Sequence, residues 1–397
     1  MVKKTGPSKK AAPSKQSSSS KQSSKKSSAP LETSSPALQS EEQQQRLLNI
    51  FSSAFNNVLT SDDFSRLLQE IKQALFNREF AAAFGREDYL EAYAARWSPT
   101  RALCYAAVFL SIKKHLDGIL IAKEETKDNK NITKEGSVSY TKIAGSTQDD
   151  ANDKPEGTEL EIFQDLKLDS TSTRRNAVLR MLSVGGCAAE HVAFASYLQT
   201  TATDGHLTLL DSGPWTTVIS LLESSTVNPP PISKYASTAR QAANHPLLEN
   251  NQLSLDVVQR DVLDLDMDSL SAQCANGRVP IILTLLFTLN ELYTTAGIGK
   301  TTKFLKNLGQ VLASDSLVLV VDSPGSYSEA ALGKEKKRYP MQWLLDHTLI
   351  ETETPGYSWE KLQSDDSIWF RLPEGLSYPI PLENMRYQMH LYRLQKP

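Results

Sequence analysis

The segment "MLSVGGCAAEHVAF", from Met181 to Phe194, decides the fold expected for this chain. A short apolar run ends at two glycines and small residues, and apolar residues then return in a helical pattern. This is typical of a strand that turns into a helix around a bound ligand. Further apolar runs alternate with helical stretches and predict strands at 177–184, 206–211, 254–260, 279–288 and 316–322. Strands separated by helices form a parallel sheet covered on both faces.

The C-terminal part of the chain has a different pattern. "SIWFRLP" and "YQMHLYRLQK" are two strand-like runs, joined by "EGLSYPIPLENMR" with no helical stretch between them. Two successive strands without a crossover helix pair antiparallel. The predicted fold is therefore α/β, a Rossmann-like parallel sheet that closes on an antiparallel C-terminal hairpin, preceded by an all-helical N-terminal region.

Composition divides the chain into four parts. Residues 1–40 predict a disordered basic tail, 41–120 a helical N-terminal region, 121–173 an acidic disordered insertion, and 174–397 the α/β domain. In the helical region, large apolar residues recur at three- and four-residue steps from Leu47 to Leu59. Two later helices are expected at 79–95 and 98–116, divided by Trp97-Ser98-Pro99, because proline fits the first position of a helix.

Charge is distributed unevenly along the chain. Residues 1–30 contain eight lysines and no acidic residue, whereas the whole chain carries a net charge of −3, so the remainder carries −11. Two lysine clusters, "KKTGPSKK" and "KQSSKK", predict a nuclear or nucleolar address and a nonspecific nucleic-acid contact, with a solvated tail as the alternative. Lysine contacts to phosphate carry no sequence specificity.

Several classes of protein are not expected from this sequence. The three cysteines, Cys104, Cys187 and Cys274, are far apart and have no CxxC spacing, which favours reduced buried thiols in an intracellular protein and predicts no metal site. The longest apolar run, "VPIILTLLF", has the length of a strand, so no membrane segment is expected. The basic N-terminus lacks the apolar stretch of a secretory signal.

Three nucleotide-binding motifs can be compared with the glycine-containing segments. A G-x-G-x-x-G fingerprint fails, because Cys187 and Glu190 stand where its second and third glycines belong. A P-loop fails in "TTAGIGKTT", where Thr294 replaces the required first glycine; Gly297 to Thr301 predicts a turn and a helix start. The acid-x-G-x-G-x-G loop that holds S-adenosylmethionine reads Ser183, Gly185, Cys187 and Ala189, with one glycine kept and small residues at the other positions.

Residues further along the chain favour the third motif. Asp211 ends the second predicted strand, where a carboxylate can accept hydrogen bonds from both ribose hydroxyls. Asp261 follows the third strand and is placed near the adenine amino group, and Asn290 and Glu291 follow the fourth. The predicted cofactor-binding residues are Gly185, Gly186, Cys187, Ala189, Asp211, Asp261 and Asn290. "NPPP" (Asn228 to Pro231) mimics an amino-group methyltransferase signature but lies between the second and third strands, so it predicts a stiff linker.

At this point the sequence resembles a known family. "RWSPTRALCY", "LSVGGCAAEHVAF", "LLDSGPW", "TLNELYTT", "VVDSPGSYSE", "YPMQWLLDHTL" and "YPIPLENMRYQMHLYRL" together resemble the fungal 25S rRNA uridine-N(3) methyltransferases. The resemblance covers about residues 45–120 and 174–396. It implies a class I methyltransferase fold, S-adenosylmethionine as cofactor, and transfer of a methyl group to a uridine ring nitrogen in large-subunit rRNA, in the nucleolus.

This chemistry requires few special residues. The uridine imide is a weak acid, so the enzyme must help it lose a proton and hold its nitrogen in line with the methyl group. Glu291 and Tyr293 are the candidate base or orienting groups, with Asp322 as a further candidate; for each, a polar cap at a strand end is the alternative.

The expected partner is rRNA or a pre-ribosomal particle, bound by a monomer. "KEKKRYPMQW" predicts an RNA-facing loop through Lys334, Lys336, Lys337 and Arg338, with a solvated turn as the alternative. Two other functions stay open at this stage. One is a non-catalytic ribosome-assembly factor with a degenerate pocket, and the other is a protein methyltransferase.

Overall fold

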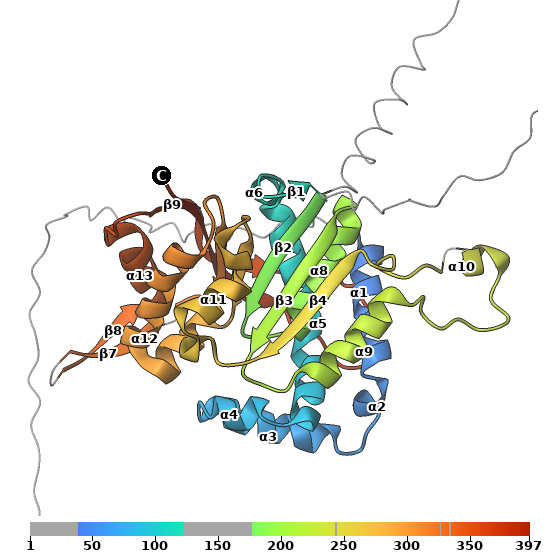
Figure 1. Ribbon diagram of the computed structural model, residues 1–397. Coiled ribbons are helices and arrows are strands. Elements are labelled where there is room, and N and C mark those ends of the chain that lie inside the picture. The colour runs from blue at the N-terminus through green and yellow to red at the C-terminus, as the bar shows by residue number, and fades with distance from the viewer. Residues whose placement is uncertain (1–38, 123–176, 243, 326, 333–334) are drawn as a thin grey trace, which may run out of the picture. The chain divides into compact units, whose positions relative to one another are not determined.

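A central sheet of eight strands organises the protein, in the order β4-β3-β2-β5-β6-β10-β9 with β1 beside β2 (Figure 1). The structure is a computed structural model and describes residues 39–122, 177–242, 244–325, 327–332 and 335–397. The strands of the sheet are β1 (Ile121–Ala122), β2 (Ala177–Val184), β3 (Asp204–Asp211), β4 (Leu253–Gln259), β5 (Ile282–Leu286), β6 (Leu317–Asp322), β9 (Ser358–Phe370) and β10 (Met385–Gln395).

The strand directions confirm the predicted fold class. Strands β2 to β6 run parallel to one another, and β10 lies between β6 and β9, antiparallel to both. Every residue of β5 and β6 is buried, as expected for parallel strands covered on both faces. The C-terminal hairpin therefore extends the sheet at the β6 edge instead of forming a separate unit.

Two hydrophobic clusters lie on opposite faces of this sheet because side chains alternate along each strand. In β6, Leu317, Leu319 and Val321 belong to one cluster, whereas Val318 and Val320 belong to the other. The first cluster contains α8 (Ala188–Thr201), α9 (Thr216–Val227) and the N-terminal helices. The second contains α11 (Met267–Gln273), α12 (Leu289–Val311) and α13 (Met341–Asp346), which the π-helix η3 (His347–Glu351) extends.

The N-terminal region is helical, as predicted. Its helices are α1 (Glu41–Ala54), α2 (Asn56–Leu59), α3 (Phe64–Phe76), α4 (Phe80–Phe84), α5 (Glu87–Ser111) and α6 (Lys113–Asp117). Helix α5 packs on α8, and α1 packs on α9 (Figure 1). Because these contacts belong to the same hydrophobic cluster as one face of the sheet, residues 41–120 share their core with the α/β part.

The predicted break at Trp97-Ser98-Pro99 is wrong, since α5 continues through Pro99. Proline has no N–H to donate to the carbonyl four residues earlier, which is that of Ala95. The Tyr378 hydroxyl donates a 2.8 Å hydrogen bond to the Ala95 oxygen instead. This hydroxyl, from the segment between β9 and β10, satisfies the carbonyl that the proline leaves without a partner.

Two connecting segments agree with the sequence-based expectations. Gly297 interrupts α12 with a φ of 82°, so the "AGIGK" segment is a turn followed by a renewed helix. "NPPP" leads from the end of α9 toward α10 (Thr238–Ala242) without regular structure, as a linker would. The short 3₁₀ turns η1 (Val262–Asp264) and η2 (Ala275–Gly277) flank α11.

The basic tail and most of the acidic insertion lie outside the described residues. The insertion was expected to begin at residue 121, but Ile121 and Ala122 pair antiparallel with Val178 and Ala177 of β2. Within the part of the chain that is described, no helix has the length and apolar character needed to cross a membrane.

Candidate active site

The glycine loop connects β2 to α8. Gly185 and Gly186 have φ values of +73° and +92°, which favour glycine over residues with a side chain. The Gly185 N–H donates to the Leu210 oxygen at 2.9 Å, and the Thr288 hydroxyl donates to the Gly185 oxygen at 2.9 Å. The loop is therefore tied to the ends of both neighbouring strands.

Asp211 ends β3 next to this loop. Its Oδ2 accepts a 2.6 Å hydrogen bond from the Gly186 N–H, and its Oδ1 accepts a 2.7 Å bond from the Gly213 N–H. Burial raises the pKa of the Asp211 carboxyl, while the two amides act against that rise. Each oxygen of a carboxylate has two lone pairs, so both can also accept a hydrogen bond from a ligand.

A cavity of about 480 Å³ opens at the carboxyl ends of the parallel strands, where open α/β sheets bind their ligands. Its lining includes most of the residues that the sequence singled out: Gly185, Gly186, Cys187, Ala189, Asp211, Asp261 and Glu291. Asp261 lies beyond β4, where its Oδ1 also accepts a 2.9 Å hydrogen bond from the Leu263 N–H. The structure thus brings these seven residues together around one cavity.

The cavity lining does not include three other residues predicted from the sequence, namely Asn290, Tyr293 and Asp322. Glu291 faces the cavity from α12, and Tyr293, two residues further on, lies on the opposite side of the helix because each residue turns the helix by about 100°. Tyr293 is buried in the hydrophobic cluster with Phe304 and Leu345. The Asn290 N–H donates to Asp322 Oδ2 at 3.1 Å. Asp322, the last residue of β6, therefore accepts a hydrogen bond from the first turn of α12.

Ser183, which takes the place of the loop's usual acid, is buried within the sheet and also does not line the cavity. It pairs with Leu209 on one side and with Thr284 on the other. The acidic groups near the glycine loop are Asp211 and Glu190 instead.

Sequence reasoning missed a group of charged and aromatic residues in the cavity wall. Glu190 lies in the first turn of α8, and Arg101 reaches the cavity from α5. Burial raises the pKa of Glu190 and that of Glu291 to about 7, although the Arg101 charge acts against both rises. Glu190 follows the glycine loop directly in the sequence. A single acidic residue after the small residues Cys187 to Ala189 could have indicated a side chain at the binding site.

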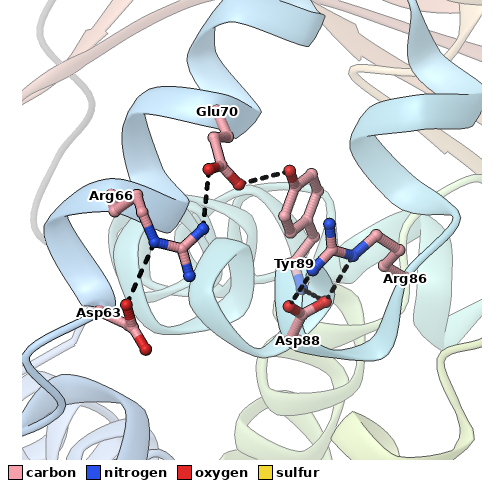
Figure 2. A network of polar contacts seen from close by, with 6 residues as sticks. All are labelled: Asp63, Arg66, Glu70, Arg86, Asp88 and Tyr89. Atoms are coloured by element: carbon pink, nitrogen blue, oxygen red, sulfur yellow. Dashed lines mark hydrogen bonds and ion pairs between the residues drawn. The ribbon is translucent and has the colours of Figure 1, made fainter.

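The α4 helix forms a second wall of the cavity, through Phe80, Ala81 and Phe84. This helix follows α3, which a polar network links to the start of α5 (Figure 2). In that network the Tyr89 hydroxyl donates to Glu70 Oε2 at 2.6 Å, and Arg66 donates to Glu70 Oε1 at 2.7 Å. Figure 2 shows the Arg86–Asp88 ion pair beside the Tyr89 ring. The network connects the two helices that flank α4.

The segment predicted as an RNA-facing loop is a hairpin instead. Strand β7 (Tyr327–Leu332) pairs antiparallel with β8 (Glu335–Pro340), so Lys336, Lys337 and Arg338 belong to a strand. Lys334 lies outside the described residues. The pattern "KEKKRYP" alternates too little between polar and apolar residues to predict a strand. Arg338 pairs with Glu329, nine residues earlier in the chain.

No group of three or more histidine, cysteine or acidic side chains suitable for a metal ion occurs among the described residues. Cys187 lines the cavity, and burial raises the pKa of its thiol well above the ordinary value. It therefore contributes a small neutral side chain to the cavity.

The parallel sheet, the glycine loop and the acidic residue at the end of β3 define a class of protein, and comparison with known sequences agrees. Residues 51–393 match the family described as "Putative SAM-dependent methyltransferase". The chain belongs to this family and is an S-adenosylmethionine-dependent methyltransferase.

One curated relative is more specific. The chain is 26% identical over 364 residues to the 25S rRNA (uridine(2843)-N(3))-methyltransferase of Saccharomyces cerevisiae. The aligned region covers 88% of this chain and 85% of the yeast protein. Solved structures with a similar fold include the 16S rRNA (adenine(1408)-N(1))-methyltransferase of Catenulisporales acidiphilia, with 12% identity, a TM-score of 0.30, and coverage of 61% of this chain and 97% of that one. The N-methyltransferase NodS of Bradyrhizobium japonicum, in complex with S-adenosyl-L-homocysteine, has 13% identity and a TM-score of 0.26, and covers 61% and 93%.

The residues around the cavity fit S-adenosylmethionine. The glycine loop borders the cavity with the bare backbone of Gly185 and Gly186, and Asp211 offers acceptor lone pairs suited to a ribose diol. Val262 and Leu263 provide an apolar surface beside Asp261, which suits a base with one polar edge. The acidic groups Glu190 and Asp211 suit the positive charge of the cofactor's amino and sulfonium groups.

Proposed function

We propose that this protein methylates N3 of a uridine in large-subunit rRNA. The observation that carries the proposal is the match to the yeast uridine-N(3) methyltransferase, which extends over 88% of this chain and includes the helices that form the cavity wall. Glu291, a partly buried acidic residue in the first turn of α12 after β5, supports the same chemistry, since N3 of uridine has to lose a proton before or during its methylation.

The proposed cofactor contacts follow the cavity from β4 to β2. Asp261 binds the adenine edge, Asp211 accepts the ribose hydroxyls, and the backbone from Gly185 to Ala189 borders the methionine part. When bound, S-adenosylmethionine supplies a methyl group on a positively charged sulfur, which accepts the electron pair of the broken carbon–sulfur bond.

Glu291 is the proposed proton acceptor. It lies beyond β5, and burial raises the pKa of its carboxyl to about 7. A carboxylate with a raised pKa is a stronger base than an exposed one and is still substantially ionised near pH 7. The Glu291 carboxylate takes the N3 proton, and the N3 lone pair forms the new bond to the methyl carbon.

The target uridine has to leave its stack to reach this cavity. Enzymes that modify the edge of a base take it out of the helix or act on single-stranded RNA, which costs a few kcal/mol for a paired base. The rings of Phe80 and Phe84 in the cavity wall supply apolar surfaces for an unstacked base.

We place a further RNA contact on the β7–β8 hairpin and the helix that follows it. Strand β8 carries Lys336, Lys337 and Arg338 in its sequence. At the end of β8 and in the helix that follows, the rings of Tyr339, Trp343 and His347 form a column with centroids 5.0 Å apart at each step and interplanar angles of 21° and 4°. The outer ring, His347, is half exposed. A nucleic-acid base can stack on such a ring.

The stacking contact can be tested by substitution of His347. His347→Ala is expected to weaken binding of a large-subunit rRNA transcript several-fold, and His347→Phe is expected to restore it because an aromatic ring is kept. Tyr235→Ala is the matched control, since Tyr235 is 83% exposed but lies in the linker after α9. Equal affinities of wild type and His347→Ala would remove this surface from the proposal.

The lysine-rich tail is proposed to direct the protein to the nucleus and nucleolus. Its eight lysines accompany no acidic residue within residues 1–30. Deletion of residues 1–30 is expected to disperse a fluorescent fusion from the nucleus and to leave turnover at low salt within a few-fold. An unchanged nuclear distribution would contradict the proposal.

The catalytic proposal is tested with purified protein. Wild type, incubated with S-adenosylmethionine and a transcript of the large-subunit rRNA, is expected to form N3-methyluridine, detected by mass spectrometry after nuclease digestion. Glu291→Gln keeps the size of the side chain but removes the base, so the rate is expected to fall by about 10²- to 10⁴-fold. Product formation by Glu291→Gln at the wild-type rate would exclude Glu291 as the base.

A further inference from the structure

Arg101 brings a cation to the cavity from a helix outside the α/β part. It lies on α5 and lines the cavity together with Glu291. Its Nη1 donates a hydrogen bond to the Tyr93 hydroxyl. The guanidinium carbon is 5.0 Å from the ring centre of Phe287 and 5.5 Å from that of Tyr93. Two aromatic rings and one hydroxyl therefore fix the guanidinium, and the bond to Tyr93 uses one of its five N–H groups.

The residue beneath this guanidinium has an unusual backbone. Phe287 has a φ of +60°, a conformation that a bulky side chain rarely adopts. Its N–H donates a 2.6 Å hydrogen bond to the Val321 oxygen of β6, which supports this conformation. Strained residues of this kind are concentrated at functional sites. Here the strained turn places the Phe287 ring under Arg101 at the end of β5.

The cavity therefore has two chemically different ends. Asp211 and Asp261 lie at the ends of β3 and β4, beyond the glycine loop, and fit a nucleoside. Phe287 and Glu291 follow β5, on the other side of β2 in the sheet order, and Arg101 of α5 packs on the Phe287 ring. The charge of Arg101 acts on Glu190 beside the glycine loop and on Glu291. The β5 end therefore brings a cation close to a carboxyl group, which is what a second, weakly acidic reactant needs.

The proposed reaction creates a charge that Arg101 can stabilise. Loss of the N3 proton leaves an anion that is shared between N3 and the two carbonyl oxygens of uracil. We propose, on the basis of the function proposed above, that Arg101 donates a hydrogen bond to a carbonyl oxygen of the target uracil and stabilises this anion while Glu291 takes the N3 proton. The N3 lone pair then forms the bond to the methyl carbon, the pair of the carbon–sulfur bond stays on sulfur, and the proton leaves Glu291 for solvent.

The role assigned to Arg101 is electrostatic stabilisation of charge that develops in the transition state. Donors held in place before the reaction starts contribute more than mobile ones, and removal of one such donor commonly lowers kcat by about 10²- to 10³-fold. Arg101 is held by Tyr93 and Phe287, so its substitution is expected to lower kcat more than it changes the KM for RNA.

The test compares two RNAs that differ in the acidity of the imide. Large-subunit rRNA transcripts are made with either UTP or 5-fluoro-UTP, since the fluorine makes N3–H more acidic and lowers the need for anion stabilisation. On the uridine transcript, Arg101→Gln is expected to lower kcat by about 100-fold, and Arg101→Lys by less because it keeps the charge. On the 5-fluorouridine transcript the deficit of Arg101→Gln is expected to shrink by at least ten-fold.

Two controls accompany these variants. Arg96→Gln removes a guanidinium from the same helix, but Arg96 pairs with Glu383 and does not line the cavity, so its kcat is expected to stay within a few-fold of wild type. Calorimetric titration of S-adenosylhomocysteine is expected to give similar affinities for wild type and Arg101→Gln. A large loss of this affinity with unchanged kcat would instead assign Arg101 to the cofactor carboxylate and overturn the inference.

The outcomes separate this inference from the proposed function. Equal deficits of Arg101→Gln on the two transcripts would overturn the role of Arg101. If Arg101→Gln does not fold, the same comparison with Arg101→Lys decides. Absence of N3-methyluridine after incubation of wild type with the uridine transcript would contradict the proposed function itself.

Discussion

The Asp211 carboxylate has two tasks at one position. It accepts the amides of Gly186 and Gly213, and it offers its other lone pairs to the cavity. Asp211→Ala is expected to lower the affinity for S-adenosylmethionine by on the order of a hundred-fold or more, since charge-assisted hydrogen bonds contribute about 1.5–3 kcal/mol each. Calorimetric titration measures this.

The matched control for Asp211 is Asp256→Ala. Asp256 is an exposed carboxylate on β4 that pairs with His206 and does not line the cavity, so its removal is expected to leave cofactor affinity unchanged. Asp261→Ala is expected to weaken binding less than Asp211→Ala. Equal affinities of wild type and Asp211→Ala, or no binding to wild type, would overturn the assignment of this loop.

Gly185 has no space for a side chain on the side that faces Thr288. A Cβ at Gly185 would lie 2.3 Å from Thr288 Cγ2, and the φ of +73° is itself unfavourable for a branched residue. Gly185→Val therefore disturbs the contact between the glycine loop and the end of β5.

His191 links the stability of the protein to pH. It is fully buried in α8, and burial lowers the pKa of its imidazole from about 6.5 to about 4. Between these values the unfolded chain binds a proton that the native protein does not, so this contribution to stability is present above pH 6.5 and is lost as pH falls toward 4. The loss amounts to on the order of 3 kcal/mol.

The measurement is urea unfolding of wild type and His191→Leu between pH 4 and pH 7. The stability of the variant relative to wild type is expected to increase as pH falls through this window. Glu190 and Glu291 have raised pKa values of about 7, so they stabilise the native state at low pH and lose that contribution as pH rises. Both proteins share this opposing effect, and it cancels in the difference. A difference that does not change with pH would contradict the assignment.

At the scale of elements, helix α5 depends on a hydroxyl from the far end of the chain. Tyr378→Phe removes the donor to the Ala95 carbonyl, which Pro99 leaves without its helical partner. The expected loss of unfolding free energy is about 1–3 kcal/mol, the effect of a buried unsatisfied carbonyl. Chemical denaturation measures it.

Tyr357→Phe is the control for this substitution. The Tyr357 hydroxyl donates to the Lys306 oxygen at 2.9 Å, but Lys306 lies inside α12, where the residue four positions later supplies an N–H to the same carbonyl. A smaller loss is expected for this variant. Equal losses for both would show that the proline has no part in the effect.

The ends of the long insertion lie side by side. Ala122 and Ala177 are cross-strand partners in the antiparallel β1–β2 pair, a separation that a two-residue hairpin turn spans. Replacement of residues 123–176 by Asn-Gly is therefore expected to leave the thermal midpoint within a few degrees, because long loops add closure entropy only logarithmically. A fall of more than ten degrees would mean that the inserted residues contribute to the folded core.

At the scale of the whole molecule, the features of the fold that could be predicted from the sequence are those that local residue patterns determine. The run at 177–184 was predicted with its observed bounds, because its apolar residues end at the two glycines that turn the chain into α8. The predicted strand at 279–288 is shorter in the structure, since Phe287 leaves the extended conformation. The seven predicted residues that line the cavity lie at or shortly after strand ends, where the fold itself dictates their position.

The features that could not be predicted from the sequence depend on contacts between segments that are far apart in the chain. Nothing in the pattern of α5 shows that Tyr378, 283 residues after Ala95, donates to the carbonyl that Pro99 leaves without its helical partner. Arg101 and the α4 wall reach the cavity only because the N-terminal helices share the core of the sheet. A helix periodicity predicts which face is buried, but not which edge of the sheet it covers.

The most direct test of the central claim is made in cells that lack this protein. N3-methyluridine in large-subunit rRNA is mapped by mass spectrometry and quantified after complementation with wild type or with Glu291→Gln at matched protein levels. The predicted result is loss of the modification at one position, its return with wild type, and its continued absence with Glu291→Gln. N3-methyluridine at wild-type levels in cells without the protein would contradict the proposed function.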